Sequence, residues 1–355
     1  MHTSLDADRV MKAAFITGHG GNEVVSIARR PKPVRQPGHV LVRLQAATLN
    51  RVDLYMRDTG VGITHQLPQI MGLDGAGTVE EVDADEPVFK PGQAVVLHPG
   101  VGCGRCEFCQ RGQVVLCLGI QYLGEHRDGT LAQWISVPAQ NVFPMPASLS
   151  FAEAAALGVN HLTAWRMLFT KAQLKPWETV LIFGIGGGVS LAALQLAKLA
   201  GAQTIVTSRD GAKLERARLL GADHLINSST QDVVKEVMAR TQGRGVDVVI
   251  ENVGAAVWSS AMKSLVRGGR LVTCGATTGD QPPADIKRIF IRQLQILGST
   301  LGNFDEFENL LRLVERTGLR PVIDSEFTLE QTHAALNRLA SGEQFGKIAI
   351  RIDGA

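Results

Sequence analysis

The segment VLIFGIGGGVSLAALQLAKLAGA, residues 180–202, constrains the fold of this 355-residue chain more than any other stretch. It begins with four apolar residues of strand type, passes through a run of glycines, and continues as an alanine- and leucine-rich helix. Glycines at such a junction permit a tight turn and let backbone N–H groups approach a pyrophosphate at the positive end of the helix. The segment therefore predicts a βαβ unit with a dinucleotide-binding turn.

The chain beyond residue 150 alternates apolar strands with amphipathic helices. Ser150, three residues before Glu153, predicts the N-cap of the first of these helices. Strand-like runs follow at 180–183, 204–208, 224–227, 246–254, 270–275 and 295–300, with helices at 189–200 and 212–220. Such alternation implies right-handed crossovers and a parallel sheet.

The earlier part of the chain is mainly β, and the last fifty residues return to it. Short strand-like runs separated by Gly, Pro and Asp occur at 12–17, 40–49, 70–82, 90–100 and 129–146. The C-terminal part carries an amphipathic helix at 304–318 and a strand-like run, FGKIAIRI. A chain of this length suits two domains. We expect an α/β protein with a β-rich substrate domain at 1–160 and 301–355, and a doubly wound domain at 161–300.

The composition limits the cellular location and the binding partners that we expect. The chain is 45% hydrophobic and 20% charged, with a formal net charge of +2, which offers no field strong enough to capture nucleic acid. Its N-terminus has early acidic residues and no cleavage site of small residues, and its apolar runs fall short of the roughly 20 residues that span a bilayer. We expect a cytoplasmic protein with no membrane or nucleic-acid partner.

Four of the five cysteines form a cluster that is typical of a metal site. Cys103, Cys106, Cys109 and Cys117 are separated by two, two and seven residues. Four thiolates close a tetrahedral shell around Zn²⁺ and leave no position for a substrate. A reducing compartment argues against two disulfides, and the clustering of the four cysteines within fifteen positions argues against four free thiols. An iron-sulfur cluster also uses four cysteines, and the spacing alone leaves that alternative open.

Several motifs together resemble the medium-chain dehydrogenase/reductase superfamily, over nearly the whole chain. They are the cysteine lobe at about 98–118, GLDGAG at 72–77, the glycine turn, and the segment VIENVG followed by GGRLVTCG, in that order. The resemblance implies a GroES-like substrate domain, a Rossmann domain and a substrate cleft between them. It favours one structural zinc on the four cysteines. QILGSTLG at 295–302 resembles the dimer-edge strand of the family, which implies a homodimer.

The catalytic-zinc ligands of the family's alcohol dehydrogenases are missing by this resemblance. Asn50, Leu73 and Val159 occupy the three ligand positions, and leucine and valine cannot bind a metal. The stretch TLNRVDLYMR at 48–57 instead resembles the quinone oxidoreductase branch, which works without catalytic zinc. That branch often lacks the cysteine lobe, so this chain combines features of both groups.

The missing ligands direct the expected reaction. Oxidation of a saturated alcohol needs an alkoxide, which zinc makes accessible as a Lewis acid. A quinone or enone that accepts hydride spreads the charge onto its own oxygen, so hydrogen-bond donors and a proton source suffice. We expect NADPH-dependent reduction of such small-molecule carbonyls. The alternatives are an NADP-dependent alcohol or aldehyde dehydrogenase, and a non-catalytic NADPH-binding redox sensor or structural protein.

The preference for NADP(H) rests on the end of the strand at 204–208. Ser208 and Arg209 stand where NAD enzymes carry an acidic residue, and they can hydrogen-bond and neutralise a 2′-phosphate. Lys213 either adds charge there or is a solvated lysine, and the competing interpretation of Arg209 is an exposed surface residue.

The predicted cofactor residues fall into the glycine turn, the 2′-phosphate site and the nicotinamide side. In the turn, Ser190 takes the place of the last glycine by resemblance, and Cys274 is expected to be a packing residue. The set comprises Gly184, Gly186, Gly187, Gly188, Val189, Ser208, Arg209 and Lys213 and, by resemblance, Asn252, Val253, Cys274, Gly275 and Ala276.

The catalytic candidates are Asn50, Asp53, Tyr55 and His161. By resemblance Asn50 hydrogen-bonds the carbonyl oxygen, whereas Asp53 is equally compatible with a structural role. Tyr55 donates to a developing oxyanion or is a core ring. Further candidates for the proton donor around the expected cleft are Tyr122 and Asn160. The histidines nearest to the cleft, which could serve as substitute metal ligands, are His65, His98 and His161, but none shows the spacing of a metal site.

Overall fold

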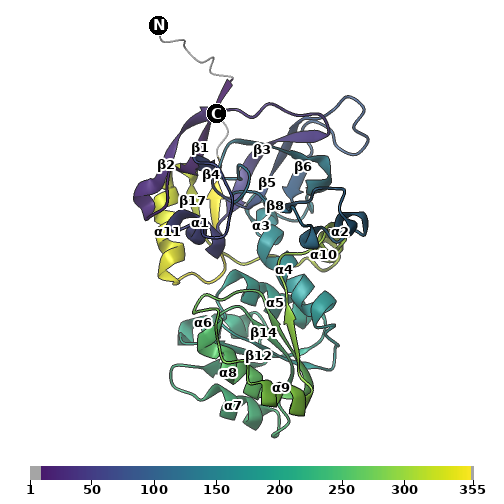
Figure 1. Ribbon diagram of the computed structural model, residues 1–355, viewed down its shortest axis with the longest axis vertical. Coiled ribbons are helices and arrows are strands. Elements are labelled where there is room, and N and C mark those ends of the chain that lie inside the picture. Colours follow the sequence, from purple (N-terminus) through teal and green to yellow (C-terminus); the bar gives the residue numbers. More distant parts are fainter. Residues whose placement is uncertain (1–8, 353–355) are drawn as a thin grey trace. The chain divides into compact units, whose positions relative to one another are not determined.

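The computed structural model describes residues 9–352 and divides into two compact units (Figure 1). Unit 1 comprises Met1–Val159 and Asn303–Ala355, and unit 2 comprises Asn160–Gly302. None of the described helices combines the length and the apolar character that a membrane span requires.

Unit 1 is built on a seven-stranded sheet in the order β10-β6-β5-β3-β18-β17, with β9 also paired to β3. A three-stranded sheet, β2-β1-β4, and a ribbon of β7 and β8 complete its strands. Their bounds are β1 Val10–Ile16, β2 Val25–Pro31, β3 His39–Thr48, β4 Gln69–Ile70, β5 Asp74–Glu81, β6 Ala94–Leu97, β7 Gly100–Val101, β8 Gln121–Tyr122, β9 Trp134–Pro138, β10 Val142–Pro144, β17 Ile323–Thr328 and β18 Lys347–Arg351.

The C-terminal strand positions a charged side chain beside the start of the first helix. Strand β18 pairs antiparallel with β3, so that Ala349 lies opposite Thr48. The buried apolar residues of both strands join one core cluster. Lys347, at the beginning of β18, is therefore placed next to the residues that follow Thr48. FGKIAIRI thus returns to the first unit, as the sequence suggested.

Three of the helices of unit 1 begin at capping boxes, which are formed at Asn50, Ser150 and Asn303. Ser150 accepts a hydrogen bond from Glu153 N and its own N–H donates to the Glu153 carboxylate, which confirms the predicted capping box. The first helix, α1, follows β3 directly and was not foreseen from the sequence, because it is only eight residues long. The bounds are α1 Arg51–Asp58, α2 Glu107–Gln110, α3 Phe151–Ala155, α10 Phe304–Thr317 and α11 Thr332–Ser341.

Unit 2 is a six-stranded parallel sheet with the order β13-β12-β11-β14-β15-β16. This order reverses between β11 and β14, where ligands of such sheets bind beyond the carboxyl ends of the strands. The strands are β11 Thr179–Ile182, β12 Gln203–Ser208, β13 His224–Asn227, β14 Val246–Glu251, β15 Leu265–Thr273 and β16 Gln295–Gly298; the helices are α4 Leu162–Trp165, α5 Gly188–Leu199, α6 Gly211–Leu219, α7 Val233–Arg240, α8 Ala255–Ser264 and α9 Ile286–Arg292.

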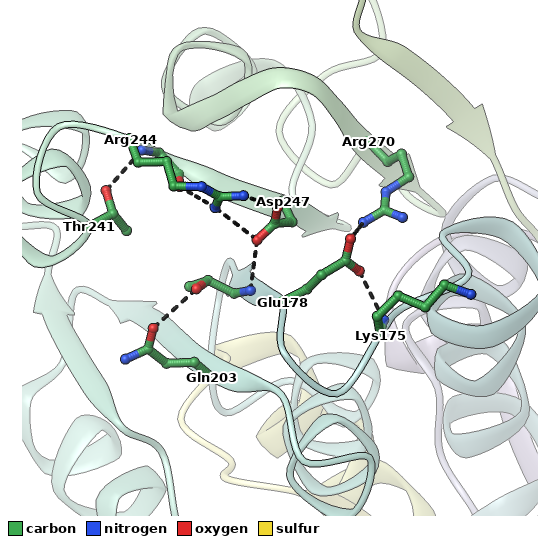
Figure 2. Close-up of polar contacts among 9 residues, drawn as sticks. Lys175, Glu178, Gln203, Thr241, Arg244, Asp247 and Arg270 are labelled. Atoms are coloured by element: carbon green, nitrogen blue, oxygen red, sulfur yellow. Dashed lines mark hydrogen bonds and ion pairs between the residues drawn. The ribbon is translucent and has the colours of Figure 1, made fainter.

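The amino ends of these strands are joined by a polar network (Figure 2). Arg270 on β15 donates to Glu178, just before β11, at 2.5 Å, and Asp247 on β14 accepts from Thr179 N at 2.9 Å. Arg244 completes the network with a 2.6 Å contact to Asp247. The side chains at this end of the sheet are occupied by one another. The carboxyl ends, with the glycine turn, are the end that fits a ligand.

Candidate functional site

The cysteine lobe brings its four thiols together. All four Sγ atoms lie within 4.8 Å of one another, and Cys117 Sγ also accepts a hydrogen bond from Cys103 N. Backbone N–H groups, that of Cys109 first, lower the pKa of Cys106 to about 6, and those of Arg105 and Cys106 lower the pKa of Cys103. Backbone donors to sulfur stabilise thiolates, which are the form that binds metal.

The geometry of this cluster suits zinc. Zn–S bonds of ~2.3 Å in a tetrahedron place sulfur atoms roughly 3.8 Å apart, within the spacing of this cluster. Cys103, Cys106, Cys109 and Cys117 would hold the ion, and four sulfur ligands make it structural. In residues 9–352 this is the one group of three or more His, Cys, Asp or Glu side chains that could hold a metal ion.

Asn50, which the sequence resemblance places at a ligand position of the family's catalytic metal, belongs to a buried network around Asp74. One carboxylate oxygen of Asp74 accepts from Thr48 Oγ1 at 2.8 Å, Asn50 Nδ2 at 2.9 Å and Lys347 Nζ at 3.0 Å. The other accepts from Val159 N at 2.7 Å. Asp74 and Lys347 are 0% and 3% exposed, so this is a fully desolvated ion pair.

The Asn50 amide is held at both ends. Its Nδ2 donates to Asp74, and its Oδ1 accepts from Lys347 Nζ at 2.6 Å. These two contacts fix which way the amide points. A primary amide has two N–H donors, and within residues 9–352 only one of them is used. The network therefore presents one oriented, unused N–H at a position that is 5% exposed.

Asp53 is a buried carboxyl group beside this network. Its Oδ2 accepts from Asn50 N at 2.6 Å at the start of α1, and Gly72 N donates to the same group. Burial raises the pKa of Asp53 to about 7, and the Asp74 charge adds to the rise, whereas Lys347 opposes it. A carboxyl with this pKa can hold or release a proton near neutrality.

Glu125 is a second such carboxyl, which the sequence did not single out. It is 8% exposed, and its carboxyl group has no hydrogen-bond partner among the described residues. Burial raises its pKa to about 7, with the Asp53 charge as the second cause. Gly124 places it there, since a Cβ at Gly124 would lie 2.5 Å from Gly72 O. Glu125 thus adjoins the Gly72 peptide that holds Asp53.

The remaining acid–base candidates have other surroundings. Tyr55 lies on α1 and is 46% exposed. His161, in unit 2, is buried, and its Nε2 contacts Gln195 Oε1 of α5 at 3.1 Å. His98 is buried against Phe304, with 4.6 Å between ring centroids. These contacts give the two histidines local packing partners.

In unit 2 the glycine turn has the conformation that its residues permit. Gly184 and Gly186 have positive φ angles of 67° and 114°, Gly187 is the N-cap of α5 and Gly188 is its first residue. Ser190 ties the turn to the sheet. Its Oγ donates to Phe183 O at 2.8 Å and accepts from Asn252 Nδ2 at 3.2 Å.

The end of β12 exposes a guanidinium group. Arg209 is exposed and makes no side-chain hydrogen bond or ion pair within residues 9–352, whereas Ser208 is buried and accepts from Asp210 N at 3.1 Å. Asp210, the next residue, is occupied as the N-cap of α6, where it accepts from Ala212 N at 2.8 Å. Arg209 is therefore the free charge at this strand end.

The ends of β14 and β15 bring the predicted nicotinamide-side residues together. Cys274 N donates to Glu251 O at 3.1 Å, and a Cβ at Gly275 would lie 3.0 Å from Asn252 O. The buried Glu251 side chain accepts from Val253 N and from Gly254 N, which organises the loop after β14. Burial raises the pKa of the Cys274 thiol to about 12, so this thiol stays protonated at neutral pH.

Fold and sites together define the class: a zinc-type oxidoreductase with a GroES-like domain and a Rossmann-like domain. The alcohol dehydrogenase GroES-like domain family matches residues 36–147, and the zinc-binding dehydrogenase family matches residues 188–316. The chain belongs to the zinc-type medium-chain dehydrogenase/reductase superfamily. Membership and the cysteine cluster indicate a structural zinc and a nicotinamide cofactor.

Individual relatives cover almost the whole chain. The NAD-dependent alcohol dehydrogenase of Sulfurisphaera tokodaii is 32% identical over 331 residues, 89% of this chain and 93% of the relative. The sorbitol dehydrogenase of Bacillus subtilis is 33% identical over 338 residues, 92% and 93% of the two chains. A crystal structure of an NAD-dependent alcohol dehydrogenase has a TM-score of 0.93 at 40% identity, covering 97% of this chain and 100% of that one. The structure of AibC has a TM-score of 0.91 at 30% identity, covering 100% and 99%.

Proposed function

We propose that this chain reduces quinones, enones and similar activated carbonyl compounds with NADPH and without a catalytic zinc. The observation that carries the proposal is the network around Asp74. Leu73 and Val159 supply no metal-binding side chain, and Asn50 is engaged by Asp74 and Lys347. An acceptor that delocalises charge onto its own oxygen needs hydrogen-bond donors and a proton, which this unit has.

Asn50 is the group that we assign to the carbonyl oxygen. Lys347 and Asp74 hold its amide so that the second N–H is preorganised. A preorganised donor in a desolvated position stabilises the developing oxyanion more than a solvated one does. The adjoining Lys347 ammonium makes the amide a stronger donor by polarising its oxygen.

The Asp53 and Glu125 pair is the proposed proton source. A bound nicotinamide cofactor would supply a hydride to the conjugated carbon of the substrate. The resulting enolate or hydroquinone anion then takes one proton, which gives the saturated ketone or the hydroquinone. Glu125 and Asp53 both have pKa values raised to about 7, so the pair carries a transferable proton at neutral pH.

The preference for NADPH is supported by the end of β12. Arg209 is exposed and without an acidic partner among the described residues, and Asp210 is occupied at the α6 N-cap. A guanidinium can bind a 2′-phosphate bidentately. Several relatives are named NAD-dependent, which makes the 2′-phosphate the feature to test.

We assign substrate binding to unit 1 and dinucleotide binding to unit 2, in line with the predicted domains.

We also propose that the chain forms a homodimer. The outer edge of β16, which is unpaired within the described residues, and the exposed apolar residues of α9 support this proposal. Ile286 and Phe290 are 70% and 65% exposed on α9, and exposed apolar patches of this kind mark association surfaces.

A second candidate function is alcohol oxidation, which the names of the alcohol and sorbitol dehydrogenase relatives favour. In that direction the Glu125 and Asp53 pair would act as the base. Steady-state assays with NADPH and NADH against 1,4-benzoquinone and 2-cyclohexenone, and with NADP⁺ and NAD⁺ against primary alcohols and sorbitol, separate the two. The proposal expects NADPH oxidation by the conjugated acceptors to exceed alcohol oxidation by at least about 100-fold in kcat/KM, because alcohol oxidation would lack a Lewis acid that is worth several kcal/mol. Tight NADPH binding with no turnover of any of these compounds would instead support the non-catalytic alternative.

A further inference from the structure

Unit 1 contains a cavity of about 480 Å³ that none of the groups above uses. Its lining comes from the end of β2 and the segment after it, from β9, from the segment at 123–129, and from single residues of β1, β3 and β4. The volume lies within the range of small-molecule sites. The residues that matter for its chemistry are Arg30, Lys32, His39, Arg127 and Trp134.

The lining is strongly basic, and two of its cations have no acidic partner among the described residues. The guanidinium groups of Arg30 and Arg127 are partly buried and have no hydrogen-bond or ion-pair partner among residues 9–352, although Arg30 lies over the Phe15 ring at 5.0 Å from its centroid. Lys32 is paired with Glu80 at 3.2 Å. Asp128, the acid in the lining, already accepts from Ile70 N at 3.1 Å.

A buried polar group in the lining also lacks a partner. The indole Nε1 of Trp134 is buried without a hydrogen-bond acceptor in the described part of the chain. The Lys32 ammonium lies 4.3 Å from the centroid of the same ring. Buried polar groups are nearly always hydrogen-bonded, and the positive charge over this ring adds to the basic character of the lining.

His39 responds to this positive field. Its Nδ1 lies 3.3 Å from Ser136 Oγ on β9. Burial lowers the pKa of His39, and the charges of Arg127 and Arg35 lower it further, while Asp83 and the Ser136 contact oppose them. The groups that face this imidazole thus add up to a potential that disfavours another positive charge.

We propose that this cavity is a binding site for a small organic dianion, a phosphate monoester or a dicarboxylate, gripped between Arg30 and Arg127. Guanidinium groups bind phosphate and carboxylate oxygens bidentately. Two guanidinium groups that form no ion pair in the described residues and line one cavity match an oxyanion of charge −2. The proposal concerns unit 1 alone and does not depend on the reaction proposed above.

The site is tested by NMR of His39 in protein labelled with ¹³C at the histidine Cε1, assigned with His39→Gln. Inorganic phosphate and succinate are titrated separately against chloride of equal ionic strength. A bound dianion offsets the Arg127 and Arg35 charges, so the pKa of His39 rises, and it does so saturably. A His39 pKa that saturates with phosphate alone identifies a phosphate monoester as the ligand class, and one that saturates with succinate alone identifies a dicarboxylate.

Arg30→Gln with Arg127→Gln should raise the half-saturating concentration by about tenfold or more, since both charge-assisted contacts are lost. Arg29→Gln is the matched control, because Arg29 is the exposed neighbour of Arg30 on β2, and it should stay within about twofold of the parent. If the double variant fails to fold, Arg127→Gln alone serves. A His39 response that follows ionic strength equally in chloride, or saturation that is unchanged in these variants, overturns the proposal.

Discussion

The cysteine lobe and the Asp74 network lie in the same unit, and the sequence resemblance aligns them with the two places where zinc alcohol dehydrogenases of this family hold metal. The lobe has four sulfur donors within 4.8 Å of one another. The network joins one carboxylate, one amide, one hydroxyl and one ammonium. Leu73 and Val159, which the resemblance places at the other ligand positions, carry no metal-binding group. In the Asp74 network the Lys347 ammonium group already forms an ion pair with the Asp74 carboxylate. Four sulfur donors suit a metal ion, whereas a carboxylate that is already paired with an ammonium group does not need one.

The largest expected effect comes from breaking the lobe. Cys103→Ser with Cys106→Ser should lower bound zinc from about one ion per chain to near zero, because two of the four ligands disappear. Zinc analysis and amide hydrogen exchange over residues 98–118 measure the loss of metal and of local structure. Cys274→Ser is the control, and it should keep its zinc. A double variant that retains a full equivalent would show that the lobe is not the zinc site.

The Asp74 network is tested by removing its cation. Lys347→Met leaves Asp74 buried without its ion-pair partner, which should lower the free energy of unfolding by about 3–5 kcal/mol. Denaturant unfolding measures the change. Lys90→Met, at an exposed position, should be near neutral. Adding Asp74→Leu to Lys347→Met should recover part of the loss, and no recovery would contradict the description of this pair.

Glu125→Gln tests the proton source. The variant keeps the shape but cannot donate the proton, so the reduction rate should fall by about 100-fold. In the parent, the rate should decline as the pH rises through about 7, because Glu125 and Asp53 then lose their proton. The variant should show a flatter profile, and Glu308→Gln, at an exposed position, should behave as the parent. A parent-like rate and profile for Glu125→Gln would exclude this role.

Glu125→Gln should also have a higher free energy of unfolding than the parent at high pH. The folded-state pKa of Glu125 is raised, so its protonation favours the folded state at low pH, and this contribution is lost as the pH rises from about 4.5 through about 7. Glutamine avoids the cost of ionising the buried group. Glu125→Gln should therefore exceed the parent by about 1–3 kcal/mol at pH 8.5 and by little at pH 4. Equal differences at both pH values would contradict the assigned shift.

The smallest expected effect concerns the cofactor. Arg209→Asp should lower kcat/KM for NADPH by about 10- to 100-fold and change the value for NADH little, because the aspartate repels the 2′-phosphate and loses the guanidinium contact. Initial rates with both nicotinamides measure this. Lys235→Asp, which makes the same charge change at an exposed position of α7, controls for net charge. An unchanged ratio of kcat/KM for NADPH to kcat/KM for NADH would show that groups other than Arg209 bind the 2′-phosphate.

The sequence predicted the parts of the molecule that are local. The glycine turn, the four cysteines and the Ser150 cap each lie within a short stretch, and each appears as a compact unit in the fold. The contacts of Lys347 could not be predicted, since it reaches Asn50 across 297 residues and Asp74 across 273. Glu125 was missed because its importance comes from burial beside Gly72, which no spacing in the sequence reveals.

The central claim is that this enzyme holds zinc in the lobe alone and transfers hydride to an acceptor that delocalises its own charge. Anomalous diffraction at the zinc edge, from crystals grown with NADPH and zinc, tests it most directly. We predict one peak per chain, bound by Cys103, Cys106, Cys109 and Cys117. A second peak beside Asn50 or Asp74 would contradict the account.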